Sequence, residues 1–234
     1  MNIVITGASR GIGFALAKKF AQTPGNKVFA LARTEEKLAK LKSEIEQFSD
    51  DTRLFYKPFD VMTGDVKNEL LPVIKEDMQG IDILINNAGL LLNKPFEELS
   101  DADFDLTFGV NVKGVFRLIR DLMPLINKPA HIINISSMGG FQGSAKFPGL
   151  SLYSASKGAV AVLTECLAEE LKDRKISVNS LSIGAVQTEM LKEAFPGYKA
   201  PLSSGEMAEF VADFAVNGQK YYNGKVLPVS SSTP

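Results

Sequence analysis

Short apolar runs alternate with longer amphipathic stretches along the whole chain. Runs rich in β-branched residues predict buried strands, whereas apolar residues spaced three and four apart predict helices that cover them. We expect strands over residues 2–6, 27–32, 53–59, 81–86, 130–136, 176–182 and 225–229. We expect helices over residues 11–22, 35–48, 63–79, 101–126 and 152–172, and a last one beginning after residue 203. Strands that alternate with helices indicate a parallel sheet covered on both faces.

Several of these helices carry signals for where they begin. Thr34 can cap a helix whose first turn holds two glutamates, and Ser100 with Asp103 has the spacing of a capping box. Ser203 with Glu206 repeats that spacing before the last helix. Pro72 predicts a kink, while residues 190–203 fit a loop, a short helix or a lid. The apolar faces comprise Leu38, Leu41, Ile45 and Phe48 in one helix and Met207, Phe210, Val211 and Phe214 in another.

The composition narrows the class of protein. Apolar residues make up 45% of the 234 and charged residues 23%, which is typical of a globular protein with a sizeable core. The net charge of −1 gives no reason to propose nucleic acid or an anionic membrane surface, and no apolar run approaches a membrane span. We expect one domain over residues 1–234, with a loose tail from 230, and no signal peptide before the first strand.

The chain has one cysteine and one histidine, and neither is expected to be catalytic. Cys166 is the only cysteine, which excludes an intramolecular disulfide and fits a reducing compartment such as the cytoplasm. In mid-helix, Cys166 is expected to be a small buried or interface residue. His131 is the only histidine, and it begins a strand at the end away from the expected ligand site, so a structural role is expected. No cluster of His, Cys and carboxylates suggests a metal.

A glycine-rich turn after the first strand is the first candidate site. Residues 6–13 read TGASRGIG, and an amphipathic helix follows. Backbone N–H groups at such a turn bind anions, and glycine lets the backbone approach a pyrophosphate. The spacing G-x-x-x-G-x-G differs from the usual dinucleotide fingerprint, and the alternative is a plain structural turn.

Polar residues follow several other strands. In open parallel sheets ligands bind beyond the carboxyl ends of the strands. Taken singly, each of these residues could be a turn or a cap, but together they converge on one crevice. They are Asp60, residues 86–89 (NNAG), the pair Ser136 and Ser137, and Thr188.

Tyr153 and Lys157 form the sharpest candidate pair. Four residues apart on a helix, they share one face, with Ser137 available from the preceding strand. A tyrosine pKa of about 10 is too high for acid–base work at neutral pH, and a nearby ammonium would lower it. The alternative is an exposed tyrosine and lysine at the start of a helix.

From residue 2 to about 190 the chain resembles the classical short-chain dehydrogenases/reductases. The resemblance rests on the glycine turn, the NNAG segment, Asn111, Ser137 and the Tyr153-x-x-x-Lys157 spacing. It implies a Rossmann-like doubly wound parallel sheet of about seven strands in three α/β/α layers. It also implies hydride transfer between C4 of a nicotinamide and a carbonyl or secondary alcohol carbon.

The resemblance further implies a role for each matching residue. Tyr153 would be the acid–base group, Lys157 would hold the nicotinamide ribose and lower the tyrosine pKa, Ser137 would orient the substrate oxygen, and Asn111 would anchor a proton-relaying water. Gly7, Gly11, Ile12 and Gly13 would line the pyrophosphate turn, Asp60 and Val61 the adenine, and Asn87 and Ala88 the adenosine ribose. Thr188 would meet the carboxamide or the phosphates, and Gly89, Gly184 and Val186 complete the cofactor-binding set.

The choice between NAD and NADP depends on the end of the second strand. A carboxylate there would bind the ribose 2′-hydroxyl of NAD, whereas an arginine suits the 2′-phosphate of NADP. The strand ends without a carboxylate and is followed by Arg33, while Ser9 and Arg10 in the glycine turn add donors. We therefore expect NADP(H) rather than NAD(H); the alternative is that Arg33 is simply solvated.

The chain departs from the family pattern in places. Ile183-Gly184 stands where the family usually has Pro-Gly, and Asn223-Gly224 replaces the common Asp-Gly-Gly. The segment from Ser137 to Tyr153 is slightly long, so Ser136 competes with Ser137 as the catalytic serine. These departures leave the glycine turn and the Tyr153–Lys157 pair intact.

We predict a carbonyl reductase or alcohol dehydrogenase with a mostly apolar pocket. Its walls are expected to be Leu91, Phe141, Gln142, Phe147, Leu150, Leu152 and residues 190–198. Within the family, the alternatives are a 3-oxoacyl-carrier-protein reductase and a sepiapterin-like pterin reductase. The former would need a basic surface, for which Lys113, Arg117 and Arg120 are candidates.

A second class of function is a non-catalytic NADP(H)-sensing protein. A sensor has no use for an acid–base pair, so Tyr153→Phe would discriminate the two. The resemblance also implies a homodimer or homotetramer, built through the helices around residues 103–126 and 153–171.

Overall fold

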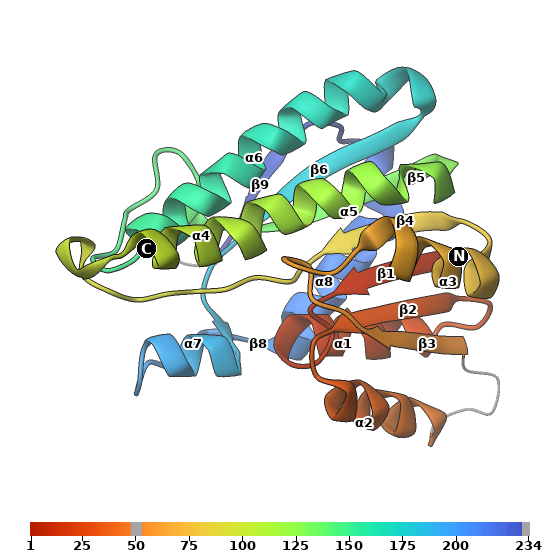
Figure 1. Ribbon diagram of the computed structural model, residues 1–234, viewed down its shortest axis with the longest axis horizontal. Coiled ribbons are helices and arrows are strands. Elements are labelled where there is room, and N and C mark those ends of the chain that lie inside the picture. The colour runs from red at the N-terminus through yellow and green to blue at the C-terminus, as the bar shows by residue number, and fades with distance from the viewer. Residues whose placement is uncertain (48–52, 231–234) are drawn as a thin grey trace.

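The computed structural model describes residues 1–47 and 53–230, and its centre is a seven-stranded parallel sheet (Figure 1). The strand order is β3-β2-β1-β4-β5-β6-β9, so the chain starts in the middle, winds to one edge and returns to build the other. In open sheets the point where the winding reverses, here between β1 and β4, is where ligands bind. The strands are β1 Asn2–Thr6, β2 Lys27–Ala32, β3 Arg53–Pro58, β4 Ile81–Asn86, β5 Ile126–Ser137, β6 Ile176–Ile183 and β9 Val226–Val229.

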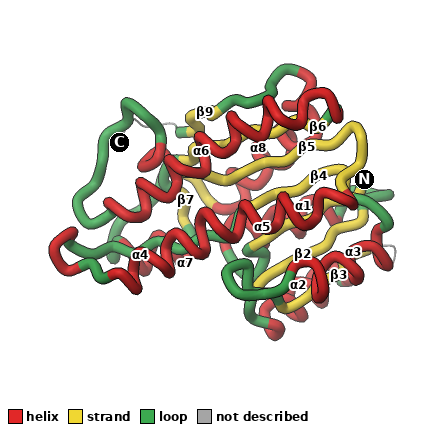
Figure 2. The backbone as a smooth tube through the Cα atoms, turned by 45° about the horizontal axis from the view of Figure 1, so that its top comes forward, coloured by secondary structure: helices red, strands yellow, loops and turns green. Residues whose placement is uncertain are grey.

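Helices cover both faces of the sheet, which confirms the three layers. Alternate strand residues enter opposite cores: Ile3 and Ile5 pack with α1, α2 and α8, whereas Val4 packs with α3, α5 and α6. Figure 2 shows the sheet held between the two helical layers. The helices are α1 Gly11–Ala21, α2 Glu35–Glu46, α3 Leu71–Met78, α4 Asp101–Phe108, α5 Gly114–Leu122, α6 Ser151–Leu171, α7 Glu189–Ala194 and α8 Ser204–Asn217.

Two expected helices are interrupted by π-helical segments. The helix expected over 63–79 begins at a π segment, Val66–Leu70, and Pro72 lies just beyond the change to α3. The helix expected over 101–126 contains the π segment Gly109–Lys113 and ends at Leu122. It ends early because Pro124 lies in the following 3₁₀ turn, where it has no N–H to continue the helix.

The capping boxes are confirmed, whereas one predicted cap is wrong. Ser100 accepts from the backbone N–H of Asp103, and Ser203 accepts from that of Glu206. Thr34 precedes α2, but its side chain makes no capping hydrogen bond. On α8, Phe210 is 45% exposed, so the apolar face is narrower than expected. Leu38, Leu41 and Ile45 are fully buried, and Phe48 lies outside the described residues.

The ambiguous stretch 190–203 is a short helix followed by a turn. It supplies most of α7 and the short strand β8 Leu202–Ser203, which pairs with β7 Val186–Gln187. Within 1–47 and 53–230, no helix has the length and hydrophobicity needed to cross a membrane. The expectation of a single domain stays a prediction.

The two residues set aside as structural behave differently. His131 is fully buried, and its Nδ1 donates to the carbonyl of Ala215 while Asn179 donates to its Nε2. Burial lowers the pKa of His131 to about 4, so the ring is neutral. Cys166 is exposed on the chain, which contradicts the expectation of a small buried residue and leaves an interface role untested.

Candidate active site

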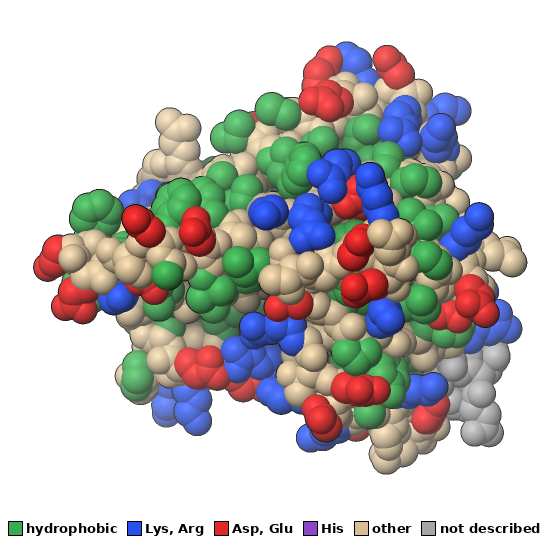
Figure 3. All heavy atoms as spheres, in the orientation of Figure 1, with side chains coloured by type: hydrophobic (Ala, Val, Ile, Leu, Met, Phe, Trp, Pro, Cys, Tyr) green, Lys and Arg blue, Asp and Glu red, His purple; other side chains and the backbone are tan. Residues whose placement is uncertain are grey.

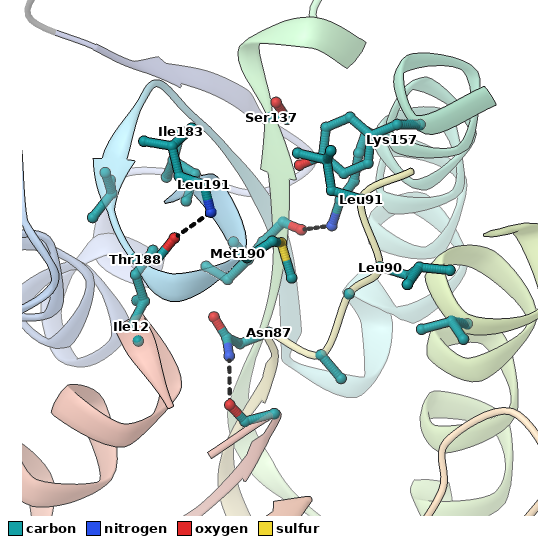
Figure 4. Close-up of a pocket in the computed structure, with 18 of the residues that line it drawn as sticks. Ile12, Asn87, Leu90, Leu91, Ser137, Lys157, Ile183, Thr188, Met190 and Leu191 are labelled. Carbon is teal, nitrogen blue, oxygen red and sulfur yellow. Dashed lines mark hydrogen bonds between the residues drawn. The ribbon is translucent and has the colours of Figure 1, made fainter. Parts of the chain in front are cut away.

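A cavity of about 730 Å³ opens at the carboxyl ends of the strands (Figure 4). It is lined by the glycine turn, the loop after β4, the end of β5, α6, and residues from Ile183 to Tyr198. Most predicted site residues meet there. They are Gly7, Ser9, Arg10, Gly11, Ile12, Arg33, Asp60, Val61, Asn87, Ala88, Gly89, Leu91, Ser137, Phe147, Leu150, Tyr153, Lys157, Gly184, Val186 and Thr188.

The glycines of the turn have different physical roles. Gly7 and Gly11 have φ of 70° and 57°, in the left-handed region that side chains disfavour. Gly13 instead makes a close packing contact, because a Cβ there would lie 2.3 Å from the carbonyl oxygen of Gly7. Gly13 does not line the cavity itself, but its lack of a side chain lets α1 begin directly beneath the turn.

Thr6 connects this turn to the loop after β4. Its Oγ1 accepts from the backbone N–H groups of Asn87 and Ala88, at 3.0 and 2.9 Å. The Asn87 amide returns a bond of 3.0 Å to the carbonyl of Thr6. This role of Thr6 was not predicted from the sequence, although a hydroxyl at the end of a strand that precedes a glycine turn is a usable signal.

Ser137 and Tyr153 lie next to each other in the lining of the cavity. Ser137 Oγ accepts from the N–H of Gly139 at 3.2 Å and hydrogen-bonds to the phenol of Tyr153. Burial raises the pKa of Tyr153, and the Ser137 hydroxyl partly offsets that rise. The expected lowering of the Tyr153 pKa by Lys157 is therefore not what this structure shows: burial raises the pKa, and the opposing contribution comes from Ser137.

Lys157 is buried beside this pair. Its Nζ donates to the carbonyl of Ile135 at 2.8 Å and lies 5.9 Å from the centre of the Tyr153 ring (Figure 4). Burial lowers the pKa of Lys157 to about 8, so the ammonium form still dominates at neutral pH. A Cβ at Gly89 would lie 3.4 Å from that Nζ, so the loop after β4 passes close to the ammonium.

The neighbouring serine has a different environment. Ser136 is buried, and its Oγ donates to the backbone carbonyl of Lys157 at 2.9 Å. It therefore ties β5 to α6, whereas Ser137 at the next position carries the hydroxyl that meets Tyr153.

Asn111 lies behind the cavity rather than in its wall. It occupies the π segment between α4 and α5. Its amide donates to the carbonyl of Leu90 and to Ser156 Oγ, both at 2.9 Å, and its Oδ1 accepts from Leu90 N–H at 2.7 Å. The side chain thus fixes the loop after β4 against α6, and the expected water relay stays a prediction.

Charged residues gather where the glycine turn meets the end of β2. Arg33 is exposed, lines the cavity and makes no ion pair with any residue that the structure describes. Arg10 pairs with Glu193 at 2.5 Å, and that hydrogen bond is the main cause of its raised pKa. Asp60 accepts from the N–H of Met62 at 2.8 Å, which holds the turn after β3.

The apolar wall of the cavity differs from the expected one. Phe141 and Gln142 line a separate hollow of about 550 Å³, which shares Gly139, Phe147 and Leu150 with the main cavity, and Leu152 lines neither. The apolar residues that the sequence analysis did not name include Leu31, Leu90, Leu106, Val110, Ile135 and Met138. They lie on strands, helices and loops whose relative positions only the folded chain shows.

Two of the three basic residues considered for a carrier protein are engaged elsewhere. Arg117 donates to the carbonyls of Met62 and Gly64, at 2.8 and 2.5 Å. Arg120 pairs in bidentate fashion with Asp121. Lys113 remains exposed, so the basic surface on α5 is smaller than the sequence suggested.

Ile183, in place of the usual proline, extends β6 by one residue. The next N–H, of Gly184, donates to the carbonyl of Val229 at 2.9 Å. A Cβ at Gly184 would lie 2.4 Å from Ser230 Oγ, so a side chain here would have to displace that of Ser230.

Comparisons with known proteins agree with this geometry. The sequence model described as short chain dehydrogenase matches residues 1–199. A fatty acyl-CoA reductase of Acinetobacter baylyi is 35% identical over 213 residues, which cover 89% of this chain and 70% of that relative.

Solved structures give the same picture. The 3-ketoacyl-(acyl-carrier-protein) reductase of Brucella melitensis, complexed with NADH, superposes with a TM-score of 0.87 at 29% identity, covering 99% of this chain and 97% of the other. The L-sorbose reductase of Gluconobacter frateurii, complexed with NADPH and L-sorbose, gives 0.87 at 25% identity, covering 99% and 95%.

Proposed function

Because the chain belongs to the short-chain dehydrogenase family, we propose that it is an NADP(H)-dependent oxidoreductase acting on a carbonyl or a secondary alcohol. The observation that carries the proposal is the placement of Ser137, Tyr153 and Lys157 in one cavity with the glycine turn. The family consists of oxidoreductases, and the acid–base group, its hydroxyl partner and its ammonium are all present. A nucleotide sensor would need only the glycine turn.

The residues of the turn fit a dinucleotide. The start of α1 offers free backbone N–H groups to a pyrophosphate, and Gly7 and Gly11 keep the surface of the turn bare. Asp60, Val61, Asn87, Ala88 and Thr188 extend the lining on either side. When bound there, NADPH would supply the hydride.

The chain's own groups would manage the proton. Tyr153, with its pKa raised by burial, holds its proton at neutral pH and gives it to the carbonyl oxygen as the carbon accepts the hydride. Ser137 donates a hydrogen bond to the same oxygen, and the Lys157 ammonium stabilises the phenolate that remains. One hydride on the carbon and one proton on the oxygen together reduce the carbonyl to an alcohol.

The preference for NADP(H) rests on two arginines. The known neighbours include an NADH complex and an NADPH complex, so likeness alone does not choose between the two cofactors. Arg33 and Arg10 both line the cavity beside the paired ends of β1 and β2, where no carboxylate ends β2. A planar guanidinium matches a phosphate better than a hydroxyl.

The apolar wall favours a ketone or aldehyde with hydrophobic bulk. Met190, Leu191 and Phe195 face Leu90, Leu91 and Leu150 around the cavity. A second candidate is reduction of an acyl thioester, because a fatty acyl-CoA reductase and a 3-ketoacyl-carrier-protein reductase are among the similar proteins. The reduced basic surface on α5 supports a carrier-protein partner less than a small thioester.

We also propose that the protein works in the cytoplasm as a homodimer or homotetramer. Figure 3 shows hydrophobic side chains on the face formed by α4, α5 and α6, and the exposed apolar residues of these helices include Phe104, Leu106, Phe116 and Val162. Exposed apolar side chains on one face are typical of an interface between subunits. Light scattering at micromolar concentration that finds only monomer would contradict this assembly.

The test is oxidation of NADPH, with NADH in parallel, against hydrophobic ketones and aldehydes, β-ketoacyl thioesters and pterins. We expect faster turnover with NADPH than with NADH, and the compound with the highest kcat/KM would identify the substrate class. Tight NADPH binding without turnover on any class would favour the sensor.

A further inference from the structure

Helix α7 lies against the glycine turn at more than one point. A Cβ at Gly11 would lie 3.2 Å from Thr188 Cγ2 and 3.8 Å from a carboxylate oxygen of Glu189. One turn along α7, Glu193 forms a bidentate ion pair with Arg10, with N–O distances of 2.5 and 3.2 Å. At the other end, Asn93 donates to the carbonyl of Ala194 at 3.0 Å. Contacts from two different loops therefore hold α7 across the cavity mouth.

The ion pair engages one of the two arginines that would meet a 2′-phosphate. Arg10 and Arg33 follow β1 and β2, which pair through Thr6 and Leu31, and Ala8 N–H bonds to the Leu31 carbonyl at 3.0 Å. Both arginines line the cavity. Arg33 makes no ion pair within the described ranges, whereas both terminal nitrogens of Arg10 donate hydrogen bonds to the Glu193 carboxylate.

We propose that Glu193 is a cofactor-specificity residue, which competes with the 2′-phosphate of NADP(H) for Arg10. The proposal rests on the function proposed above. A 2′-phosphate would have to share or displace the Glu193 carboxylate, while the 2′-hydroxyl of NAD(H) carries no charge to compete. Glu193 thus weakens NADPH binding selectively and moderates a preference that Arg10 and Arg33 alone would make stronger.

The charges around the ion pair also indicate that Glu193 weakens the binding of NADPH. Lys37 interacts with Glu193, and Glu189 interacts with Arg10, so further charges of both signs surround the ion pair. The Arg10 and Glu193 side chains are 35% and 63% exposed, so solvent screens the pair and limits its strength. Removing the Glu193 carboxylate makes the net charge around Arg10 more positive, which favours a ligand with an extra phosphate.

The experiment is a fluorescence titration of NADPH and NADH against the wild-type protein and Glu193→Gln. We expect the Kd for NADPH to fall by about threefold to fivefold, the scale of one exposed ion pair, with the Kd for NADH unchanged. The matched control is Glu209→Gln, which breaks the exposed Lys19–Glu209 pair of 3.2 Å and touches no cavity residue. It should change neither affinity.

A double-mutant cycle separates competition for Arg10 from a general effect of charge. In an Arg10→Gln background, Glu193→Gln should lose most of its effect on NADPH, because the contested group is gone. An equal effect in both backgrounds would overturn the proposal.

The outcomes also separate this inference from the function on which it rests. A wild type that prefers NADPH, with a Glu193→Gln variant that binds it equally or more weakly, would overturn the role of Glu193 alone. A wild type that prefers NADH, or binds neither nucleotide, would overturn the proposed cofactor and this inference together.

Discussion

The two walls of the cavity are held by different kinds of contact. The wall formed by β5 and α6 is fixed by buried hydrogen bonds, from Ser136 to the Lys157 carbonyl and from Asn134 to Thr164. The wall formed by α7 has no buried residue, and its ties are the exposed ion pair to Arg10 and one bond from Asn93.

This difference matches what each wall has to do. In the proposed mechanism, Tyr153 must stay within hydrogen-bond reach of the reacting oxygen, so its helix must not move. In the same proposal the α7 wall would meet the variable part of a substrate, and exposed contacts are weak enough to let it adjust. Changes in the first wall should therefore affect folding or chemistry, and changes in the second mainly affinity.

The largest effect is expected in the glycine turn, which lies in neither wall but packs closely against backbone atoms. Gly13→Ala places a Cβ 2.3 Å from the Gly7 carbonyl, and a backbone atom cannot yield as a side chain would. We expect the unfolding free energy, measured by urea denaturation, to fall by about 3 kcal/mol. Gly205→Ala, in an exposed turn of α8 with ordinary contacts, should cause no loss and serves as the control. Similar stabilities in the two variants would show that the turn has room for a Cβ.

The next comparison sets the adjacent serines against each other. Ser137→Ala removes the hydroxyl that meets Tyr153 and should lower kcat by about 100-fold, the usual loss for one polarising donor, at unchanged stability. Ser136→Ala removes a buried bond to α6, so it should lower the unfolding free energy by about 1 kcal/mol and change kcat far less. The reverse pattern would make Ser136 the catalytic serine.

A third effect appears in the pH dependence of stability. Burial lowers the folded-state pKa of His131 to about 4, whereas the unfolded value is about 6.5. Between those values the unfolded chain binds more protons, so stability is full above pH 6.5 and falls as the pH drops. We expect a loss of about 2 kcal/mol from pH 7 to 5, measured by denaturation. His131→Asn should remove most of that slope, and an unchanged slope would contradict the assignment.

The smallest effect is expected on the α7 wall. Leu191 lines the cavity and is only partly buried, so Leu191→Ala should raise KM for a hydrophobic substrate by about fivefold at unchanged kcat and stability. Its neighbour Lys192 is exposed and lines no cavity, so Lys192→Ala should leave KM unchanged. A drop in kcat in Leu191→Ala would show that this wall also positions the chemistry.

The sequence predicted the central strands, the glycine turn and the Tyr153–Lys157 helix well, because their signals are local. The bounds of β1, β2 and β4 match the predicted runs, and the glycine turn and the Tyr153–Lys157 pair lie in short segments of regular spacing. The apolar lining of the cavity could not be predicted so well. Phe141 and Gln142 sit in an irregular loop whose path no periodicity records.

Contacts between residues far apart in the chain could not be predicted from the sequence either. Arg10 and Glu193 are 183 residues apart, and either charge alone reads as a solvated surface residue. The hydrogen bonds of Thr6 could not be predicted for the same reason, because its two backbone partners belong to the loop after β4. Only the order of strands in the sheet brings these groups together.

The central claim is that Tyr153 is the acid–base group of a reductase. The most direct measurement compares kcat and the NADPH Kd of the wild type with those of Tyr153→Phe, using Tyr56→Phe on β3 as the control. We expect Tyr153→Phe to lose turnover by at least about 1,000-fold while the Kd stays within about threefold, because the phenol proton acts only in the chemical step. Undiminished turnover in Tyr153→Phe would contradict the account.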